Sequence, residues 1–409
     1  MNRNSTFRGV MSAFIMALLC LSAFTWGLSV DGVTPVNNRD YVSAVHTLIK
    51  GAKSNIRVMA YQAWYYEDYP NSDSNIFIEE LIEAKKRGVE VWFFLETSNW
   101  DENLDDKNHA YAKRLEKGGI KVFFDHKEYT SHEKVIIIDD YATVVASINW
   151  SHFSLWLNNE VGVIIWSRPV AKAFSEYMND LLKQAGHDAI PLTKSEKVIP
   201  SEGFEKLQAE DVTLLTNRAY FPALHEAFEK AKNSIHVVQR QALYYTMVPP
   251  YATDKDRKPG DPISQTNVLM KDLIRAKKRG VDVQVVLDAE VRKRKSTGEW
   301  QVNNRNEDFA MRLLAGSITV YYDSLTTQTH AKMVIVDDQT IVGSTNWTYN
   351  ALEQGNEASV LIKSTEVADY YRDFVEEIKR PGLKVEPGFD IFSLMRERKR
   401  KDEEAEKKR

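Results

Sequence analysis

The strongest constraint on the fold of this chain is an internal duplication. Three segments of the first half recur in the second half in the same order: residues 52–66 with 231–245, 81–96 with 273–288, and 119–125 with 317–323. Self-similarity of this kind marks repeated structural units, and copies this long exclude a short-period solenoid. The sequence therefore predicts two related units within one chain.

Each unit alternates helix-like and strand-like stretches. Residues 76–87 and 268–279 have apolar positions at helical spacing and end in basic residues followed by glycine, a common signal for the end of a helix. Apolar strand-like runs follow at 89–95 and 281–287. This alternation predicts an α/β fold in which helices cover the sheets.

The repeats and the stretches around them divide the chain into five regions. We expect a signal peptide or N-terminal membrane anchor at 1–31, a first repeat at 38–184, a connection at 185–217, a second repeat at 218–380 and a charged tail at 381–409. Within the second repeat, residues 247–264 are rich in proline and aspartate, which predicts an irregular insertion.

The N-terminal segment predicts export. Arg3 and Arg8 precede an apolar run that has no charged residue before Asp31. A positive start before an apolar core is typical of a secretory signal, and the run is also long enough to span a bilayer uncut. We therefore expect a secreted or periplasmic protein, or one anchored to the membrane with its catalytic body outside the cytoplasm. The single cysteine, Cys20, lies in this segment, which excludes disulfides and cysteine metal sites elsewhere.

One constellation of polar residues recurs in both repeats. Its members are His132, Lys134, Asp139, Ser147, Asn149 and Glu160 in the first repeat, and His330, Lys332, Asp337, Ser344, Asn346 and Glu357 in the second. A histidine and a lysine two residues apart on a strand point to the same face. Lysine is a good partner for an anion, and the donors of serine, asparagine and histidine suit phosphate oxygens. Two copies facing each other would place two histidines and two lysines around one phosphorus.

The motifs H-E-K-V-I-I-I-D with A-S-I-N, and H-A-K-M-V-I-V-D with G-S-T-N, resemble the paired HKD motifs of the phospholipase D superfamily. The resemblance covers nearly all of residues 40–380. It implies an α/β sandwich of two repeats packed about a pseudo-two-fold axis, with a single shared active site and with no metal or other cofactor. It also implies that one motif histidine attacks phosphorus to form a phosphohistidine, while the other protonates the leaving oxygen.

The same resemblance assigns roles to the remaining residues of the constellation. It implies that the lysines, serines and asparagines stabilise the phosphate oxygens. Glu160 and Glu357 would hold each histidine in its tautomer, and Asp139 and Asp337 would support the loop and strand. One departure is Ala146, which stands where the first motif usually has glycine. It removes no catalytic group, so we expect an active enzyme.

The sequence leaves the phosphodiester substrate open. The net charge of −4 disfavours a nucleic-acid substrate, whereas the N-W-S and N-W-T endings of the motifs favour a nuclease. The apolar N-terminal segment and the aromatic residues beside the motifs favour a lipid. We expect a phosphoric diester hydrolase that removes phospholipid head groups at a membrane surface, with an exported nuclease acting on single-stranded nucleic acid as the alternative.

Two other functions rank lower on the sequence alone. A phosphatidyl transferase similar to cardiolipin synthase is less favoured because only one apolar segment precedes the repeats, and a catalytically dead binding protein because both His-Lys pairs are intact. Since both half-sites lie in one chain, we expect a monomer with no obligatory protein partner. The basic stretch R-K-R-K at 292–295 is either a solvated loop or one that steers phosphates.

Overall fold

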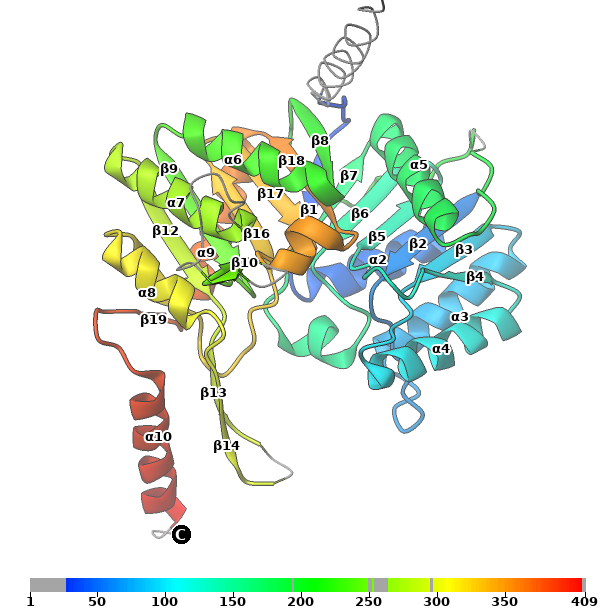
Figure 1. The fold of residues 1–409 in the computed structure, drawn as a ribbon. Helices are drawn as coiled ribbons and strands as arrows, with labels where there is room; N and C mark the ends of the chain where they lie inside the picture. Colours follow the sequence, from blue (N-terminus) through cyan, green and yellow to red (C-terminus); the bar gives the residue numbers. More distant parts are fainter. Residues whose placement is uncertain (1–26, 193–194, 249–251, 254–263, 295–296, 407–409) are drawn as a thin grey trace, which may run out of the picture.

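Two large mixed sheets form the centre of the computed structural model, which describes residues 27–192, 195–248, 252–253, 264–294 and 297–406 (Figure 1). In spatial order the first sheet contains β1 (Val33–Pro35), β7 (Gly162–Trp166), β6 (Ala142–Ala146), β5 (Lys134–Ile138), β2 (Asn55–Ala60), β3 (Glu90–Leu95) and β4 (Lys121–Phe124). The second sheet contains β19 (Leu383–Lys384), β15 (Thr319–Tyr322), β12 (Asp282–Leu287), β9 (Ser234–Gln239), β16 (Lys332–Val336), β17 (Gln339–Gly343), β18 (Ala358–Lys363) and β8 (Asp211–Thr216).

The two sheets confirm the predicted duplication. The order β7-β6-β5-β2-β3-β4 in the first matches β18-β17-β16-β9-β12-β15 in the second. In both sheets the strands before the motif are parallel to one another, and the motif strand and the two after it run antiparallel. The edge strands β1 and β8 also occupy equivalent places, beside β7 and β18.

Helices cover the outer face of each sheet and join the core between the sheets. The helices are α2 (Asp40–Gly51), α3 (Asp73–Lys86), α4 (Glu102–Lys117), α5 (Arg168–Gln184), α6 (Tyr220–Lys230), α7 (Gln265–Lys278), α8 (Glu307–Ala315), α9 (Thr365–Lys379) and α10 (Ile391–Glu406). The first sheet packs against α2, α3 and α4, and the second against α6, α7 and α8. The core between the sheets also contains residues of α5 and α9. The fold is therefore the α/β sandwich of two repeats that the sequence predicts.

Both faces of each motif strand are buried, which explains its continuous apolar run. In β5, Val135 and Ile137 belong to the core between the sheets, whereas Ile136 and Ile138 face the outer helices. The equivalent strand β16 alternates in the same way. Strands buried on both faces read as unbroken hydrophobic stretches. The motif strand is fixed by the core, so the polar residues at its start have a defined position.

The folded body begins before the predicted end of the N-terminal segment. Leu28 exchanges backbone hydrogen bonds of 2.8 and 3.0 Å with Val212, and its side chain packs against the core between the sheets. Residues 1–26, which carry most of the predicted export segment, lie outside the described residues. In the part of the chain that is described, no helix is long and apolar enough to cross a bilayer. Export stays a prediction.

Three stretches outside the duplicated segments also contain regular structure: the connection, the insertion that was expected to be irregular, and the tail. Within the connection 185–217, β8 pairs with β18 as the edge strand of the second sheet, and its apolar residues reach the core between the sheets. The insertion 247–264 contains the short pair β10 (Met247–Val248) and β11 (Ala252–Thr253), and residues 249–251 and 254–263 are outside the described part. The tail contains β19 and α10, whose Ile391 is buried in the core of the second unit.

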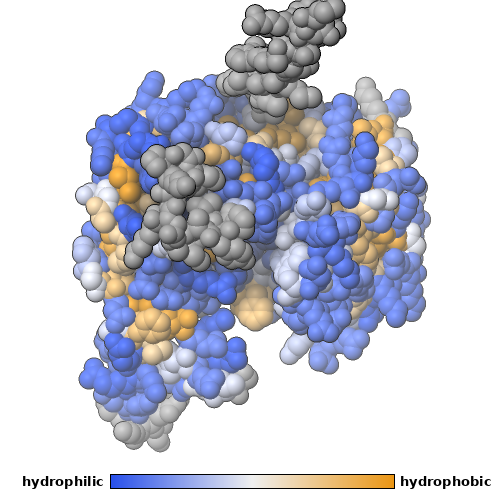
Figure 2. Space-filling model, viewed as in Figure 1, coloured by the Kyte–Doolittle hydropathy of each residue, from blue (hydrophilic) through white to orange (hydrophobic). Residues whose placement is uncertain are grey.

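A hairpin of β13 (Glu290–Lys293) and β14 (Trp300–Asn303) projects from the second unit beside α10 (Figure 1). It carries the start of the basic stretch 292–295, and residues 295 and 296 are not described. Polar residues cover most of the face of the protein shown in Figure 2, with apolar residues in separate patches. Three short helices complete the fold: the π-helices η1 (Phe153–Leu157) and η3 (Asn350–Gln354) and the 3₁₀-helix η2 (Asn217–Ala219).

Candidate active site

The two motif histidines come together because the chain before each motif strand pairs with the other repeat. The backbone N–H of His132 donates to the carbonyl oxygen of Asn356 at 2.9 Å. The N–H of His330 donates in the same way to Asn159 at 2.8 Å. Each of these asparagines immediately precedes the motif glutamate of its own repeat. The backbone therefore carries each glutamate to the histidine of the opposite repeat.

The imidazole–carboxylate pairs are crossed between the repeats. Nδ1 of His132 lies 2.9 Å from Oε2 of Glu357, and Nδ1 of His330 lies 2.9 Å from Oε2 of Glu160. A carboxylate that accepts the Nδ1 proton leaves Nε2 as the ring nitrogen with the lone pair. Both histidines line the same cavity, so Nε2 is the atom suited to attack phosphorus or to carry a proton.

The motif serines hold the glutamates. The hydroxyl of Ser147 donates to Oε2 of Glu160 at 2.5 Å, and that of Ser344 donates to Glu357. Both serines are completely buried and are not among the residues that line the cavity. The resemblance implied that they bind phosphate oxygens, but in this structure they orient the carboxylates that orient the histidines.

The motif lysines lie beside the histidines and are buried. Nζ of Lys134 donates to the carbonyl oxygen of His132 at 2.6 Å, and Nζ of Lys332 donates to that of His330 at 2.5 Å. Burial lowers the pKa of Lys134 to about 7, although Glu357 opposes the shift. Burial also lowers the pKa of Lys332 well below its usual value. These ammonium groups lack solvent, which makes an anionic substrate a favourable partner.

Burial lowers the pKa of both motif imidazoles. Burial lowers the pKa of His132 well below its usual value, and the nearby Lys134 adds to this effect. Burial and Lys332 act in the same way on His330. A neutral imidazole has the lone pair that a nucleophile or a general base requires.

These directions predict a pH profile. The site needs a protonated Lys134 to stabilise phosphate oxygens, and the proportion of that form falls above a pKa of about 7. We therefore expect kcat/KM, measured at constant ionic strength, to decline on the basic side of about pH 7. The exposed Lys172 is a control, because its replacement by glutamine should leave the profile unchanged. A rate that stays constant up to the ordinary lysine range would contradict this role for Lys134.

The motif asparagines face the cavity. Asn149 and Asn346 both line it, and Oδ1 of each is buried without a hydrogen-bond partner in the described part of the chain. Their amide groups are therefore placed to meet a substrate. Donation from Nδ2 to phosphate oxygens is the role that the resemblance implies for them.

The motif aspartates are at the opposite end of the motif strands. Asp139 accepts backbone N–H bonds from residues 53, 54 and 55 at 2.7–3.1 Å. Asp337 accepts the equivalent bonds from residues 232, 233 and 234 at 2.8–3.0 Å. Both have a positive φ, 54° and 52° respectively. They fix the turn after the motif strand and the start of β2 or β9, which is the supporting role expected for them.

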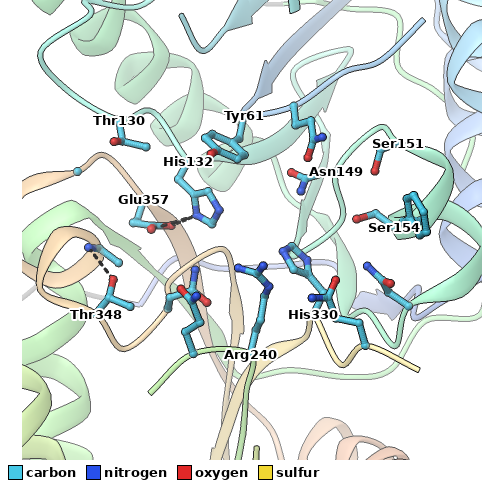
Figure 3. Close-up of a pocket in the computed structure, with 18 of the residues that line it drawn as sticks. Tyr61, Thr130, His132, Asn149, Ser151, Ser154, Arg240, His330, Thr348 and Glu357 are labelled. Atoms are coloured by element: carbon cyan, nitrogen blue, oxygen red, sulfur yellow. Dashed lines mark hydrogen bonds and ion pairs between the residues drawn. The ribbon is translucent and has the colours of Figure 1, made fainter. Parts of the chain in front are cut away.

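One cavity of about 550 Å³ joins the two half-sites. Figure 3 shows His132 and His330 pointing toward one another across it, with Asn149 and Glu357 nearby and Arg240 reaching toward the space between the histidines. Trp100 and Phe153 also line the cavity, and their side chains are largely exposed at its rim. The site is thus a polar pocket with an apolar margin on the first repeat.

Two cavity residues, Tyr61 and Arg240, were missed by the sequence analysis. Ala60 pairs with Lys134 and Gln239 pairs with Lys332, so the residue that follows each strand lies beside a motif histidine. The aligned repeats 52–66 and 231–245 place Tyr61 and Arg240 at equivalent positions. The sequence shows that one repeat has tyrosine and the other arginine at this position. Only the sheet register shows that both residues face the site.

Two pairs of buried carboxyl groups, also missed, hold the chain before each motif histidine. Glu96 accepts the N–H of Ser131 at 2.6 Å, and burial together with Asp125 raises its pKa to about 11. In the second repeat, Asp288 and Asp323 accept the N–H of Thr329 at 2.8 and 2.9 Å. These acidic residues each follow a strand of the duplicated unit, which was the only sequence signal for them.

Within the described residues, no three His, Cys, Asp or Glu side chains are grouped so that they could hold a metal ion. The carboxylates nearest the histidines are already engaged by Nδ1 and by serine hydroxyls. Independence of a metal stays a prediction.

Paired HKD motifs on a two-repeat α/β sandwich define an enzyme of the phospholipase D superfamily. Residues 45–182 and 252–379 match the family described as "Cardiolipin synthase, PLD-like domain", and the chain belongs to this family.

Curated relatives and solved structures agree with this membership. The chain is 24% identical over 326 residues to cardiolipin synthase A of Shigella flexneri, a match that covers 75% of this chain and 60% of that protein. The chain thus spans about 60% of the length of the curated relatives it matches. Its fold is similar to that of phosphatidylserine synthase from Haemophilus influenzae, with a TM-score of 0.61, 13% identity and 88% coverage of both chains. Polyphosphate kinase from Porphyromonas gingivalis is also similar in fold, with a TM-score of 0.51 and 13% identity over 91% of this chain and 56% of that one.

These relatives contradict the ranking of hydrolysis above phosphatidyl transfer. The curated relatives are named cardiolipin synthases, and a similar fold belongs to phosphatidylserine synthase. The expectation of a head-group hydrolase, with a nuclease as alternative, was therefore wrong in its order. Transfer had been ranked lower because only one apolar segment precedes the repeats. Segments outside the catalytic body do not decide whether water or an alcohol accepts the phosphatidyl group.

Proposed function

We propose that this protein transfers a phosphatidyl group from a phospholipid to an alcohol. The observation that carries the proposal is the match to the cardiolipin synthase family, on a chain whose two His–Glu pairs flank one cavity. Phosphatidyl transfer and hydrolysis share their first half, so the same site chemistry serves both. The difference is whether an alcohol or water accepts the group.

The proposed reaction has two balanced steps. Nε2 of one motif histidine, in its neutral form, attacks phosphorus as the bond to the head-group oxygen breaks. The other histidine enters this step as an imidazolium and gives its Nε2 proton to that oxygen, which leaves it neutral. In the second step this histidine takes the proton of the acceptor hydroxyl as its oxygen attacks phosphorus and the P–N bond breaks. His132 and His330 supply the two imidazoles, the two asparagines that line the cavity donate to the phosphate oxygens, and the two buried lysines beside the histidines stabilise the negative charge.

The margin of the cavity supports a lipid substrate. Phe153, Trp156 and Leu157 in η1 are 53%, 44% and 49% exposed, which is unusual for such large apolar side chains. In the equivalent turn of the second repeat, η3, the sequence is N-A-L-E-Q, and its apolar residues Ala351 and Leu352 are buried. Phe153 also lines the cavity, so acyl chains of a bound phospholipid would find apolar surface next to the reacting phosphate.

The test separates transfer from hydrolysis. Purified protein is incubated with detergent micelles that contain fluorescent phosphatidylglycerol, at increasing concentrations of a primary alcohol. We expect a new phosphatidyl ester whose yield rises with the alcohol at the expense of phosphatidic acid. His132→Ala is the blank, and His126→Ala, at an exposed position, is the matched control that should keep the activity. Phosphatidic acid as the sole product with every alcohol would overturn the proposal.

A further inference from the structure

Each motif glutamate is held through its backbone by an asparagine that precedes the first helix of its own unit. Oδ1 of Asn38 accepts the N–H of Glu160 at 2.8 Å, and Oδ1 of Asn217 accepts that of Glu357 at 2.9 Å. In return, the N–H of each asparagine donates to the carbonyl oxygen of the same glutamate, at 3.2 and 3.0 Å. Both asparagines have a positive φ, 50° and 51°, which asparagine tolerates better than most residues. We call each set of these bonds an asparagine clamp.

A buried tyrosine reinforces the clamp on Glu357. The hydroxyl oxygen of Tyr177, in α5, lies 2.7 Å from Oδ1 of Asn217 and 3.3 Å from the carbonyl oxygen of Glu357. The same hydroxyl lies 2.7 Å from Oε1 of Glu133. Tyr177 belongs to the core between the sheets and is not among the residues that line the cavity. It therefore contacts the backbone of the glutamate that orients His132, without facing the substrate.

The close contacts of Tyr177 require a proton on Glu133. Oδ1 of Asn217 accepts the N–H of Glu357, so the amide of that asparagine presents its oxygen, an acceptor, to the tyrosine. A phenol has one proton and donates to one acceptor at a time, so the second contact needs the proton of a carboxylic acid on Glu133. Burial raises the pKa of Glu133 to about 7, which increases the proportion of that form. The phenolic proton is then available to Asn217.

The second repeat has neither the tyrosine nor the acid at the corresponding positions. Glu133 is the middle residue of the first H-E-K, and Ala331 is the middle residue of the second H-A-K. Helices α5 and α9 begin alike, each after a serine that accepts the N–H three residues further on. Counted from these serines, Phe374 corresponds to Tyr177 and has no hydroxyl. The two-fold pattern of the site is thus broken at the support of His132.

Resting on the proposed transfer function, we propose that Tyr177 is a positioning residue for the reaction. It acts through Asn217 on Glu357, and so fixes the tautomer and the direction of the His132 ring. Small displacements of a reacting group cost large factors in rate, so the backbone that carries the orienting carboxylate has to be fixed. Among the described contacts, the asparagine clamp that serves the other histidine receives no such hydroxyl. The two imidazoles are therefore unequally supported.

The first measurement compares Tyr177→Phe with Tyr371→Phe in micelles of fluorescent phosphatidylglycerol, with glycerol as the acceptor. Each change removes one hydroxyl from a tyrosine of the core between the sheets, but that of Tyr371 donates to the carbonyl oxygen of Gly162 at 2.9 Å and touches neither clamp. We expect Tyr177→Phe to lower kcat by about tenfold and to change KM by less than about twofold, because Tyr177 orients a reacting group and does not meet the substrate. Tyr371→Phe should retain its kcat.

Imidazole ¹⁵N spectra give a readout that does not depend on transfer. In Tyr177→Phe and in Asn217→Gly, we expect the His132 signals to move and the His330 signals to remain. Glycine at position 217 tolerates the positive φ and removes the side-chain acceptor, so this variant carries the test if Tyr177→Phe does not fold. Asn38→Gly is the reciprocal variant, which should move the His330 signals alone.

The outcomes are distinct. His132 signals that stay in place in Tyr177→Phe, or in Asn217→Gly where the tyrosine variant does not fold, overturn the inference whatever the rate. An equal movement of both histidines also overturns it, because that would show a general disturbance of the fold. So does a loss of kcat no greater than in the Tyr371→Phe control. If the unaltered protein makes no phosphatidyl ester, the transfer function fails, and the spectra still decide whether Tyr177 positions His132.

Discussion

His132→Ala and His330→Ala are each expected to lower the rate of phosphatidyl transfer by about three orders of magnitude or more, and the double variant is expected to be scarcely worse than either single one. The reason is that the two imidazoles act on one phosphorus in successive proton and phosphoryl transfers, so removal of either stops the cycle. Both line one cavity, and each is oriented by a carboxylate from the other repeat. Residues that act as a unit are strongly non-additive.

The measurement is the initial rate of ester formation by the two single variants, the double variant and the exposed control His126→Ala. Circular dichroism of each protein establishes that it is folded. Substantial activity in either single variant, or losses that multiply in the double variant, would show that the two half-sites work independently and would refute the shared cavity.

Glu160→Gln and Glu357→Gln are expected to reduce the rate by about two to four orders of magnitude, because an amide can present its NH₂ to Nδ1 and stabilise the wrong tautomer. The crossed geometry makes a second, more specific prediction. Loss of the first-repeat carboxylate, Glu160, should disturb the second-repeat histidine, His330, and loss of Glu357 should disturb His132.

Imidazole ¹⁵N spectra of the selectively labelled protein provide the check. The chain has nine histidines, and the two of interest are assigned from the His→Ala variants. In Glu160→Gln we expect the His330 signals to move and those of His132 to remain. Glu202→Gln, at an exposed position in the connection, is the matched control. The reverse assignment, with each glutamine affecting the histidine of its own repeat, would contradict the crossed pairs.

Much of this site could be predicted because the sequence contains it twice. The duplicated pattern placed His132 and His330 correctly at the start of strands, and the apolar run after each indicated a strand buried on both faces, as β5 and β16 are. The repeated order of elements likewise indicated the two-unit α/β sandwich. These features depend on local periodicity, which a sequence expresses directly.

The crossed pairing could not be predicted, because it depends on how the two sheets pack. Within each repeat a glutamate follows its own motif histidine at a similar distance along the chain, and nothing in that spacing favours the opposite histidine. The place of Arg240 in the cavity was hidden for a related reason. It departs from the duplication, so a search for what the repeats share passes over it. The type of reaction was also misjudged, because hydrolysis was ranked above phosphatidyl transfer on evidence that lay outside the catalytic residues.

The crossed His–Glu pairs have a consequence for how activity arises during synthesis of the chain. A first unit that has emerged and folded alone has His132 but not Glu357, so its nucleophile lacks the group that orients it. The second unit alone has His330 but not Glu160, which orients it. We therefore expect reactivity toward phosphodiesters to require completed docking of the two halves. Separately produced halves, cut within residues 185–210, should be inert apart and regain activity when mixed.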